Sequence, residues 1–99
     1  MTAWCYVLRP VRLGLLTEPT ERERDVVSAH FAHLERLLAD GKLVLAGPSE
    51  AGEDTFGIVI LEGDEDEARR AMADDPAVVN GVMTARLQPF RIALLRGRD

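Results

Sequence analysis

Two histidines and one aspartate are the side chains of this sequence best suited to chemistry. His30 and His33 lie in the stretch "VVSAHFAHLERLLADGKLVLAGP", residues 26–48, whose first half has the spacing of a helix with an apolar face. His30 falls within that face, where it would point towards a sheet and a small pocket. An imidazole can take up or release a proton near neutral pH, so His30 is the first candidate for a general base or general acid. A core histidine bonded to backbone carbonyls is the alternative.

Asp75 is the candidate partner of His30. It stands in "DDPAV", where an aspartate before a proline is typical of a helix N-cap. A carboxylate at that place can also orient an imidazole and balance its charge, as acids do in many histidine-dependent sites. The two residues are far apart in the chain, so only the fold can bring them into contact. We expect His30 and Asp75 to be the catalytic pair.

The remaining candidates have simpler explanations. His33 is one helical turn from His30 and lies at the polar margin of the helix, so we expect it to be solvated rather than half of a metal site. We expect Cys5 to be a small buried hydrophobe, Glu23 a helix-capping residue and Ser28 a solvated side chain. The sequence has no phosphate-binding loop, nucleophile elbow, dinucleotide-binding glycine motif or Cys/His cluster. We therefore expect no cofactor and no bound metal.

The composition limits the possible function classes. The 99 residues predict one domain spanning residues 1–99, and a net charge of −5 without a basic stripe argues against nucleic acid as a partner. The single cysteine excludes an internal disulfide, and the N-terminus lacks the charged and apolar regions of a signal peptide. No apolar run approaches the roughly 20 residues that a membrane span needs. We expect a cytoplasmic protein that does not enter a membrane.

The elements that must position these residues alternate between strands and helices. Two capping patterns mark helix starts, Thr20 with Glu23 and Asp64 with Glu67, and the first helix is expected to run to about Asp40. The predicted strands are 3–8, 42–48, 55–63 and 82–95, and the predicted helices are 20–40 and 64–73, with a further helical turn beginning at Asp75. This β-α-β-β-α-β order predicts an α+β, ferredoxin-like fold, an antiparallel four-stranded sheet with two helices on one face.

Apolar patterning predicts how these elements pack. Three apolar side chains of the first helix lie within about 60° of Phe31, which predicts that this side faces the sheet: Val27, Leu34 and Leu38. The first and third strands are apolar on both faces, although two helices can cover only one face of the sheet. We expect the second face to meet another copy of the chain in a homodimer; ordinary exposed apolar surface is the alternative. Pro89 cannot donate to a strand ladder and is expected at an edge or bulge.

Three stretches together resemble the YciI-like (YCII-related) family: "AHFAHLERLLADGKLVLAGP", "GIVILEG" and "AMADDPAVVNGVMTARLQPFRIAL". The resemblance covers nearly the whole chain. It implies a dimeric α+β barrel of ferredoxin-like subunits, a fold shared with muconolactone isomerase and cofactor-free monooxygenases. The family's characteristic His and Asp fall on His30 and Asp75, with Asp74 as the substitute if the pairing is off by one. Some members look like dehydrochlorinases of chlorinated hydroxyquinols.

Three functions fit these observations. The first is a small cofactor-free enzyme of the lyase or isomerase type, in which His30 moves a proton on a small organic, cyclic or aromatic, molecule and Asp75 holds the imidazole. The second is a non-catalytic module that binds a small ligand or a partner protein. The third is a cofactor-free monooxygenase with Trp4 and Tyr6 lining its pocket. Isomerases, lyases and oxygenases share this fold, so the fold does not choose among them; the His/Asp pair favours the first.

Overall fold

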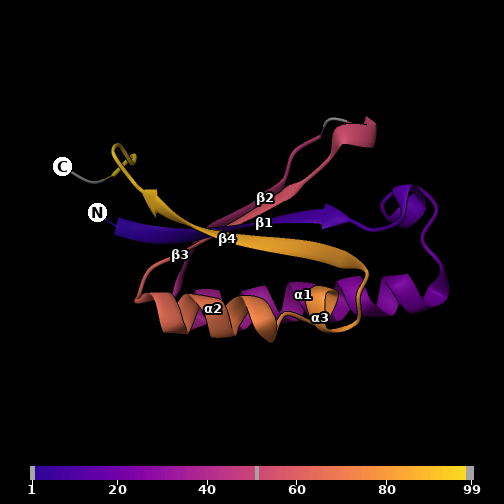
Figure 1. The fold of residues 1–99 in the computed structure, drawn as a ribbon, viewed down its shortest axis with the longest axis horizontal. Helices are drawn as coiled ribbons and strands as arrows, with labels where there is room; N and C mark the ends of the chain where they lie inside the picture. The colour runs from indigo at the N-terminus through magenta and orange to yellow at the C-terminus, as the bar shows by residue number, and fades with distance from the viewer. Residues whose placement is uncertain (1, 51, 98–99) are drawn as a thin grey trace.

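One layer of the molecule is a four-stranded antiparallel sheet, and the other is made of helices (Figure 1). The computed structural model describes residues 2–50 and 52–97. The sheet order is β2-β3-β1-β4, and each neighbouring pair is antiparallel. The elements in chain order are β1 Thr2–Pro10, the short 3₁₀ helix η1 Leu13–Leu15, α1 Glu21–Ala39, β2 Leu43–Pro48, the 3₁₀ helix η2 Gly52–Asp54, β3 Gly57–Leu61, α2 Glu65–Ala73, α3 Pro76–Val79 and β4 Met83–Arg91. This order confirms the ferredoxin-like fold predicted from the sequence.

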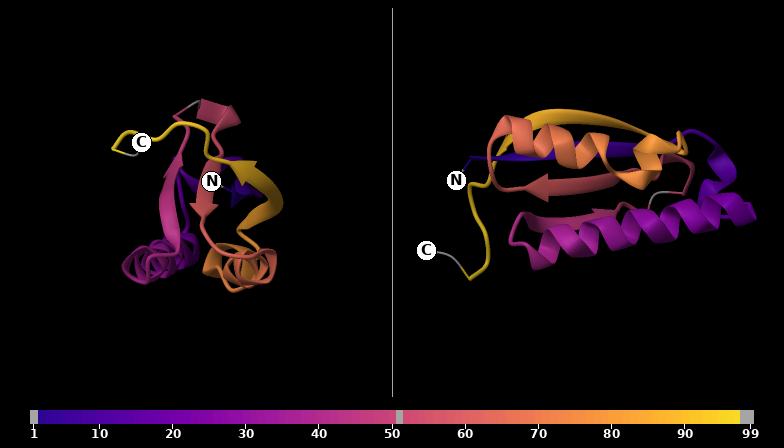
Figure 2. Two further views of the ribbon diagram at one scale, coloured as in Figure 1. Left: turned by 90° about the vertical axis from the view of Figure 1, so that its left-hand side faces the viewer. Right: turned by 90° about the horizontal axis from the view of Figure 1, so that it is seen from below.

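Both long helices lie on the same side of the sheet (Figure 2). Helix α1 packs over β2, whereas α2 packs over β1 and β4. The short helix α3 follows α2 and contacts α1. The start of α3 is therefore next to α1, although the two segments are distant in sequence.

The last strand is shorter than the sequence predicts. β4 pairs with β1 from Met83, opposite Pro10, to Arg91, opposite Thr2. Within the described residues β4 ends at Arg91, and Ile92 beyond it packs against Ala3, Cys5 and Ile60 of the sheet. Pro89 lies on β4, which is an edge strand, as its missing amide hydrogen predicted.

Helix α1 begins where the sequence predicts. Thr20 Oγ1 accepts a hydrogen bond from the Glu23 amide, and the Glu23 carboxylate accepts one from the Thr20 amide, which completes the capping box. Glu23 also accepts a hydrogen bond from Nε of Arg12 at 3.0 Å. The hydrogen bonds from Arg12 and from the Thr20 amide lower the pKa of Glu23 to about 2. This ion pair fastens the connector after β1 to the first turn of the helix.

The buried side of α1 is rotated from the side that the sequence predicts. Phe31 and Leu38 are 63% and 58% exposed, so the prediction that they face the sheet is wrong. The buried side chains of the helix are instead Glu23, Val26, His30, His33 and Leu34. The reason is that α1 packs against α3 as well as β2. Successive residues of a helix are about 100° apart, so a buried stripe centred near His30 is one such step away from a stripe centred on Phe31.

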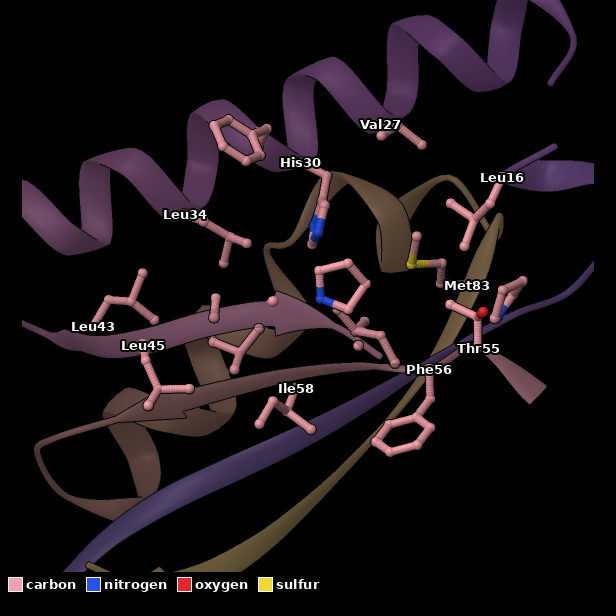
Figure 3. A pocket seen from close by; sticks show the side chains of 18 of the residues that line it. Leu16, Val27, His30, Leu34, Leu43, Leu45, Thr55, Phe56, Ile58 and Met83 are labelled. Atoms are coloured by element: carbon pink, nitrogen blue, oxygen red, sulfur yellow. The ribbon is translucent and has the colours of Figure 1, made fainter. Parts of the chain in front are cut away.

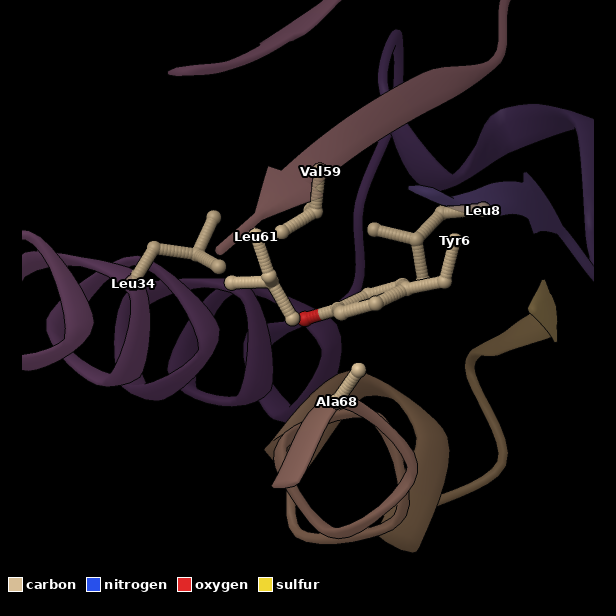
Figure 4. Close-up of a cluster of buried hydrophobic side chains, with 6 residues drawn as sticks. All are labelled: Tyr6, Leu8, Leu34, Val59, Leu61 and Ala68. Atoms are coloured by element: carbon tan, nitrogen blue, oxygen red, sulfur yellow. The ribbon is translucent and has the colours of Figure 1, made fainter. Parts of the chain in front are cut away.

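Apolar side chains cover both faces of the sheet. The main core lies between the sheet and the helices and consists of Tyr6, Leu8, Leu34, Val59, Leu61 and Ala68 (Figure 4). A second cluster occupies the opposite face and is formed by Ala3, Cys5 and Ile60, with Val7, Val44, Ile58 and Ile92 packed against it. Burial raises the pKa of the Cys5 thiol, which fits the predicted role of a small hydrophobe. Within the described residues, no helix is long and apolar enough to cross a membrane.

Candidate active site

His30 lies in the middle of α1, and its side chain points from the helix towards the sheet (Figure 3). The residues one turn before and after it, Val26 and Leu34, are also buried. Val26 shares a buried cluster with Ala77 of α3. This packing docks the first turn of α3 one helical turn away from His30, and so brings the start of α3 to the imidazole.

Asp75 is the N-cap residue of α3, as the sequence predicts. Its Oδ1 accepts a hydrogen bond from the Ala77 amide at 2.9 Å, and Pro76 takes the first helical position. The side chain is fully buried, with 0% exposure. A carboxylate with this cap hydrogen bond and no access to solvent is held in one orientation.

The fold brings the two predicted residues into direct contact. His30 Nδ1 lies 2.7 Å from Asp75 Oδ1, and both side chains are buried. Asp74, the alternative partner, is instead the exposed C-cap residue of α2. The histidine is therefore paired with Asp75, and the carboxylate that caps α3 also orients the imidazole.

Tyr6 adds a third member that the sequence analysis did not assign to this pair. Its hydroxyl donates a hydrogen bond to Asp75 Oδ2 at 2.7 Å. The ring lies in the main core and the hydroxyl points from β1 towards the helices (Figure 4). The signal was present in the sequence, because a tyrosine at an inward position of an apolar strand needs a buried acceptor for its hydroxyl.

These contacts determine where the protons lie. Burial alone would raise the pKa of Asp75, but the hydrogen bonds from His30 and Tyr6, the imidazole charge and the Ala77 amide together lower it. Burial and the adjacent Asp75 charge raise the pKa of Tyr6, which therefore stays protonated. A carboxylate can only accept hydrogen bonds, so we assign the proton of the neutral imidazole to Nδ1. Nε2 then carries the lone pair.

A cavity of about 460 Å³ opens beside His30, between α1 and the sheet (Figure 3). Its lining residues are Leu8, Pro10, Leu16, Val27, His30, Phe31, Leu34, Glu35, Leu38, Leu43, Leu45, Ala46, Gly47, Pro48, Thr55, Phe56, Gly57, Ile58, Val59 and Met83. Only His30 and Glu35 among them are ionisable, and Glu35 is exposed. The volume lies in the range of small-molecule sites. The cavity is thus an apolar space with one buried imidazole in its wall.

The other candidates take structural roles or lie elsewhere. The prediction that His33 is solvated is wrong: it is buried, and its Nε2 lies 2.9 Å from the Ala71 carbonyl oxygen, which ties α1 to α2. Cys5 lies on the opposite face of the sheet. Trp4 and Tyr6 pack in the core and are absent from the cavity lining. The described residues contain no group of three or more His, Cys, Asp and Glu side chains placed to hold a metal ion.

The solved structures that share this fold include those of two enzymes. One is 5-chloro-2-hydroxyhydroquinone dehydrochlorinase (TftG) from Burkholderia phenoliruptrix AC1100 in complex with 2,5-dihydroxybenzoquinone, at 24% identity and a TM-score of 0.61, covering 97% of this chain and 99% of that chain. The other is SnoaB, a cofactor-independent oxygenase from Streptomyces nogalater, at 11% identity and a TM-score of 0.54, covering 98% of this chain and 97% of that chain. At these identities the likeness establishes the fold alone.

Sequence comparison identifies the family. The chain has no match among the curated proteins. The family profile of the YCII-related domain matches residues 5–90. The match includes Tyr6, His30 and Asp75 and spans most of the chain. The protein therefore belongs to the YCII-related domain family.

Proposed function

We propose that this protein is a small enzyme of the lyase or isomerase type, with His30 as its general base and general acid and Asp75 as the residue that orients His30. One observation carries the proposal: the His30 Nδ1–Asp75 Oδ1 contact of 2.7 Å lies at the wall of an apolar cavity of about 460 Å³. Buried and paired titratable groups in such a cavity are typical of sites for proton transfer.

The chemistry follows from the direction of the hydrogen bonds. With Nδ1–H bound to Asp75, Nε2 can remove a proton from a molecule in the cavity. The imidazolium that forms is stabilised by the Asp75 carboxylate, and this stabilisation is stronger in a cavity of low dielectric constant than in water. Elimination of a leaving group, or return of the proton to another atom, completes a lyase or an isomerase cycle.

The cavity lining indicates the class of substrate. It contains no lysine or arginine, so a phosphate or a multiply charged acid would meet no counter-ion except His30 itself. A small, largely apolar ring compound with one acidic hydrogen fits this lining. The 2,5-dihydroxybenzoquinone bound to TftG supports a ring compound as the ligand class.

A non-catalytic binding module is the second candidate. It is favoured by the same lining, because an almost wholly apolar cavity with one imidazole can hold a ligand without changing it. A ring compound that saturates the cavity and dissociates chemically unchanged, with no proton exchanged with solvent, would support this candidate over the enzyme.

Substitution of Asp75 by asparagine should lower the pKa of His30. The carboxylate favours the charged imidazole, whereas the neutral amide does not, and we expect a fall of about one pH unit, or roughly 1.4 kcal/mol of coupling. The measurement is a ¹⁵N NMR titration of His30 in the wild type and in Asp75→Asn.

His33 is the internal control for this titration. It lies on the same helix and bonds the Ala71 carbonyl rather than Asp75, so its titration should not move. If the His30 titration is the same in both proteins while the fold is intact, the pair is not coupled. That result would contradict the enzyme proposal and favour the non-catalytic binding module.

We also propose that the protein forms a homodimer through the sheet face opposite the helices. The apolar side chains of that face that are only partly buried in the single chain support this, namely Val7, Val44 and Ile58, together with the exposed Phe90, which pairs with Ala3. Light scattering after gel filtration should give twice the chain mass. In Val7→Lys, which puts a charge on that face, it should give the chain mass. If the wild-type protein has the mass of one chain at micromolar concentration, the dimer proposal is wrong.

A further inference from the structure

Tyr6 and Asp75 both lie outside the cavity lining, which His30 alone of the three hydrogen-bonded side chains reaches. Tyr6 cannot touch a molecule bound there, since it is absent from the lining and is fully buried in the core. Its hydroxyl nevertheless ends 2.7 Å from Asp75 Oδ2. Any effect of Tyr6 on the site must therefore act through Asp75.

The two carboxylate oxygens of Asp75 accept hydrogen bonds from three donors. Oδ1 accepts from His30 Nδ1 at 2.7 Å and from the Ala77 amide at 2.9 Å, while Oδ2 accepts from Tyr6. Because Tyr6 and Ala77 hold opposite ends of the carboxylate, the group cannot rotate to exchange its oxygens without breaking both bonds. The plane of the carboxylate, and with it the direction of the imidazole, is fixed from both sides.

Core packing holds the Tyr6 ring in one orientation, so its hydroxyl cannot turn to another acceptor. The ring is enclosed by its core neighbours Leu8, Leu61 and Ala68, and close packing of this kind leaves no room for a second rotamer. The hydroxyl is thus held at Oδ2 by the core, not by the hydrogen bond alone.

We propose that Tyr6 is a positioning residue of this site, which pins Asp75 Oδ1 towards His30 and limits how tightly the His30–Asp75 pair takes up a proton. This inference rests on the proposed function, in which that pair moves the proton. A donor on Oδ2 partly compensates the carboxylate charge, so the charge that remains to attract a proton onto His30 is smaller.

The titratable groups around His30 come from three elements. β1 supplies Tyr6, the N-cap of α3 is Asp75, and α1 itself supplies the exposed Glu35 at the cavity and the buried His33, which is bonded to the Ala71 carbonyl. The parts of η1, β2, β3 and β4 and their flanking residues that line the cavity contribute no ionisable side chain. A change at Tyr6 should therefore reach His30 through Asp75 only.

The test uses the fact that Tyr6 is the single tyrosine of the sequence. Tyr6→Phe removes the donor, and we expect the pKa of His30 in a ¹⁵N NMR titration to rise by about 0.5–1 unit, because more of the Asp75 charge is left to stabilise the imidazolium. Growth on a ring-fluorinated tyrosine makes the phenol more acidic and a stronger donor at this one residue. In that protein the pKa of His30 should fall.

The control separates this inference from the proposed function. His33 should titrate as in the wild type in both proteins, which reports that α1 is intact. If Asp75→Asn moves His30 but neither change at Tyr6 does, Tyr6 is a core residue only and the inference is wrong, while the proposed pair stands. If Asp75→Asn does not move His30 either, the proposed function fails first. Should Tyr6→Phe not fold, the fluorinated protein still decides the matter.

Discussion

Replacing Asp75 with alanine should destabilise the protein by about 3–5 kcal/mol, because it removes one partner of a buried, charged hydrogen-bond network. Three donors lose their acceptor at once: the Tyr6 hydroxyl, His30 Nδ1 and the Ala77 amide. Two of them are side-chain groups in the buried interior, where an unsatisfied polar group costs about 1–3 kcal/mol each. Loss of the helix cap adds about 1 kcal/mol. A domain of this size has only about 5–15 kcal/mol in total.

Asp74→Ala is the matched control for this prediction. Asp74 is the adjacent residue, is exposed and caps the end of α2 through its backbone alone, so its loss should change stability by no more than about 0.5 kcal/mol. Urea unfolding followed by circular dichroism measures both variants. A midpoint for Asp75→Ala as high as that for Asp74→Ala would mean that the buried network contributes nothing to stability.

The same substitution should change how stability depends on pH. The pKa of Asp75 is lowered in the folded protein, so its contribution is present above the ordinary aspartate value and is lost as the pH falls through the folded value. The wild type should therefore lose stability more steeply in acid than Asp75→Ala. The pKa of Glu23 is also lowered, so its protonation in acid destabilises both proteins equally and cancels in the comparison. Unfolding curves for the two proteins at a series of pH values between neutral and strongly acid conditions test this.

The sequence predicted the local features of the site well, because they depend on neighbouring residues. The cap at Asp75 and the following Pro76 are a pattern of adjacent residues, and the structure has both. The capping box at Thr20 and Glu23 is of the same kind. The position of Pro89 on an edge strand followed from its missing amide hydrogen. Each of these needs only a few residues of one chain segment.

The features that the sequence did not predict depend on contacts between distant segments. The apolar arc of α1 is wide, so its buried stripe could be centred on Phe31 or on His30. Only the packing of α3 against Val26 places the centre near His30. The burial of His33 depends on an acceptor in α2, the Ala71 carbonyl. The contact of Tyr6 with Asp75 likewise joins β1 to α3. Patterns within one helix or strand carry no information about these partners.

Substitution of His30 by glutamine should lower the rate of a base-promoted elimination in the cavity by about 100-fold or more, the usual contribution of a general base. A nitrobenzisoxazole is a suitable probe, because it is a small apolar aromatic whose ring opening requires only the removal of one carbon-bound proton and gives a coloured phenolate. The cavity of about 460 Å³ can hold it beside His30. The initial rate of colour formation at saturating probe measures the effect, and in the wild type it should rise with pH as His30 loses its proton.

His33→Gln is the control, since His33 lies one turn further along the same helix and is occupied by the Ala71 carbonyl. This variant should keep the wild-type rate and pH profile, while His30→Gln should lose both. Asp75→Asn should fall between them, because the base remains but its orientation and the stabilisation of its charge are weakened. A wild-type rate no higher than that of His30→Gln, with the probe shown to bind, would mean that Nε2 does not act as a base. The cavity would then hold ligands without moving their protons, and the binding module would be the better account of the pair.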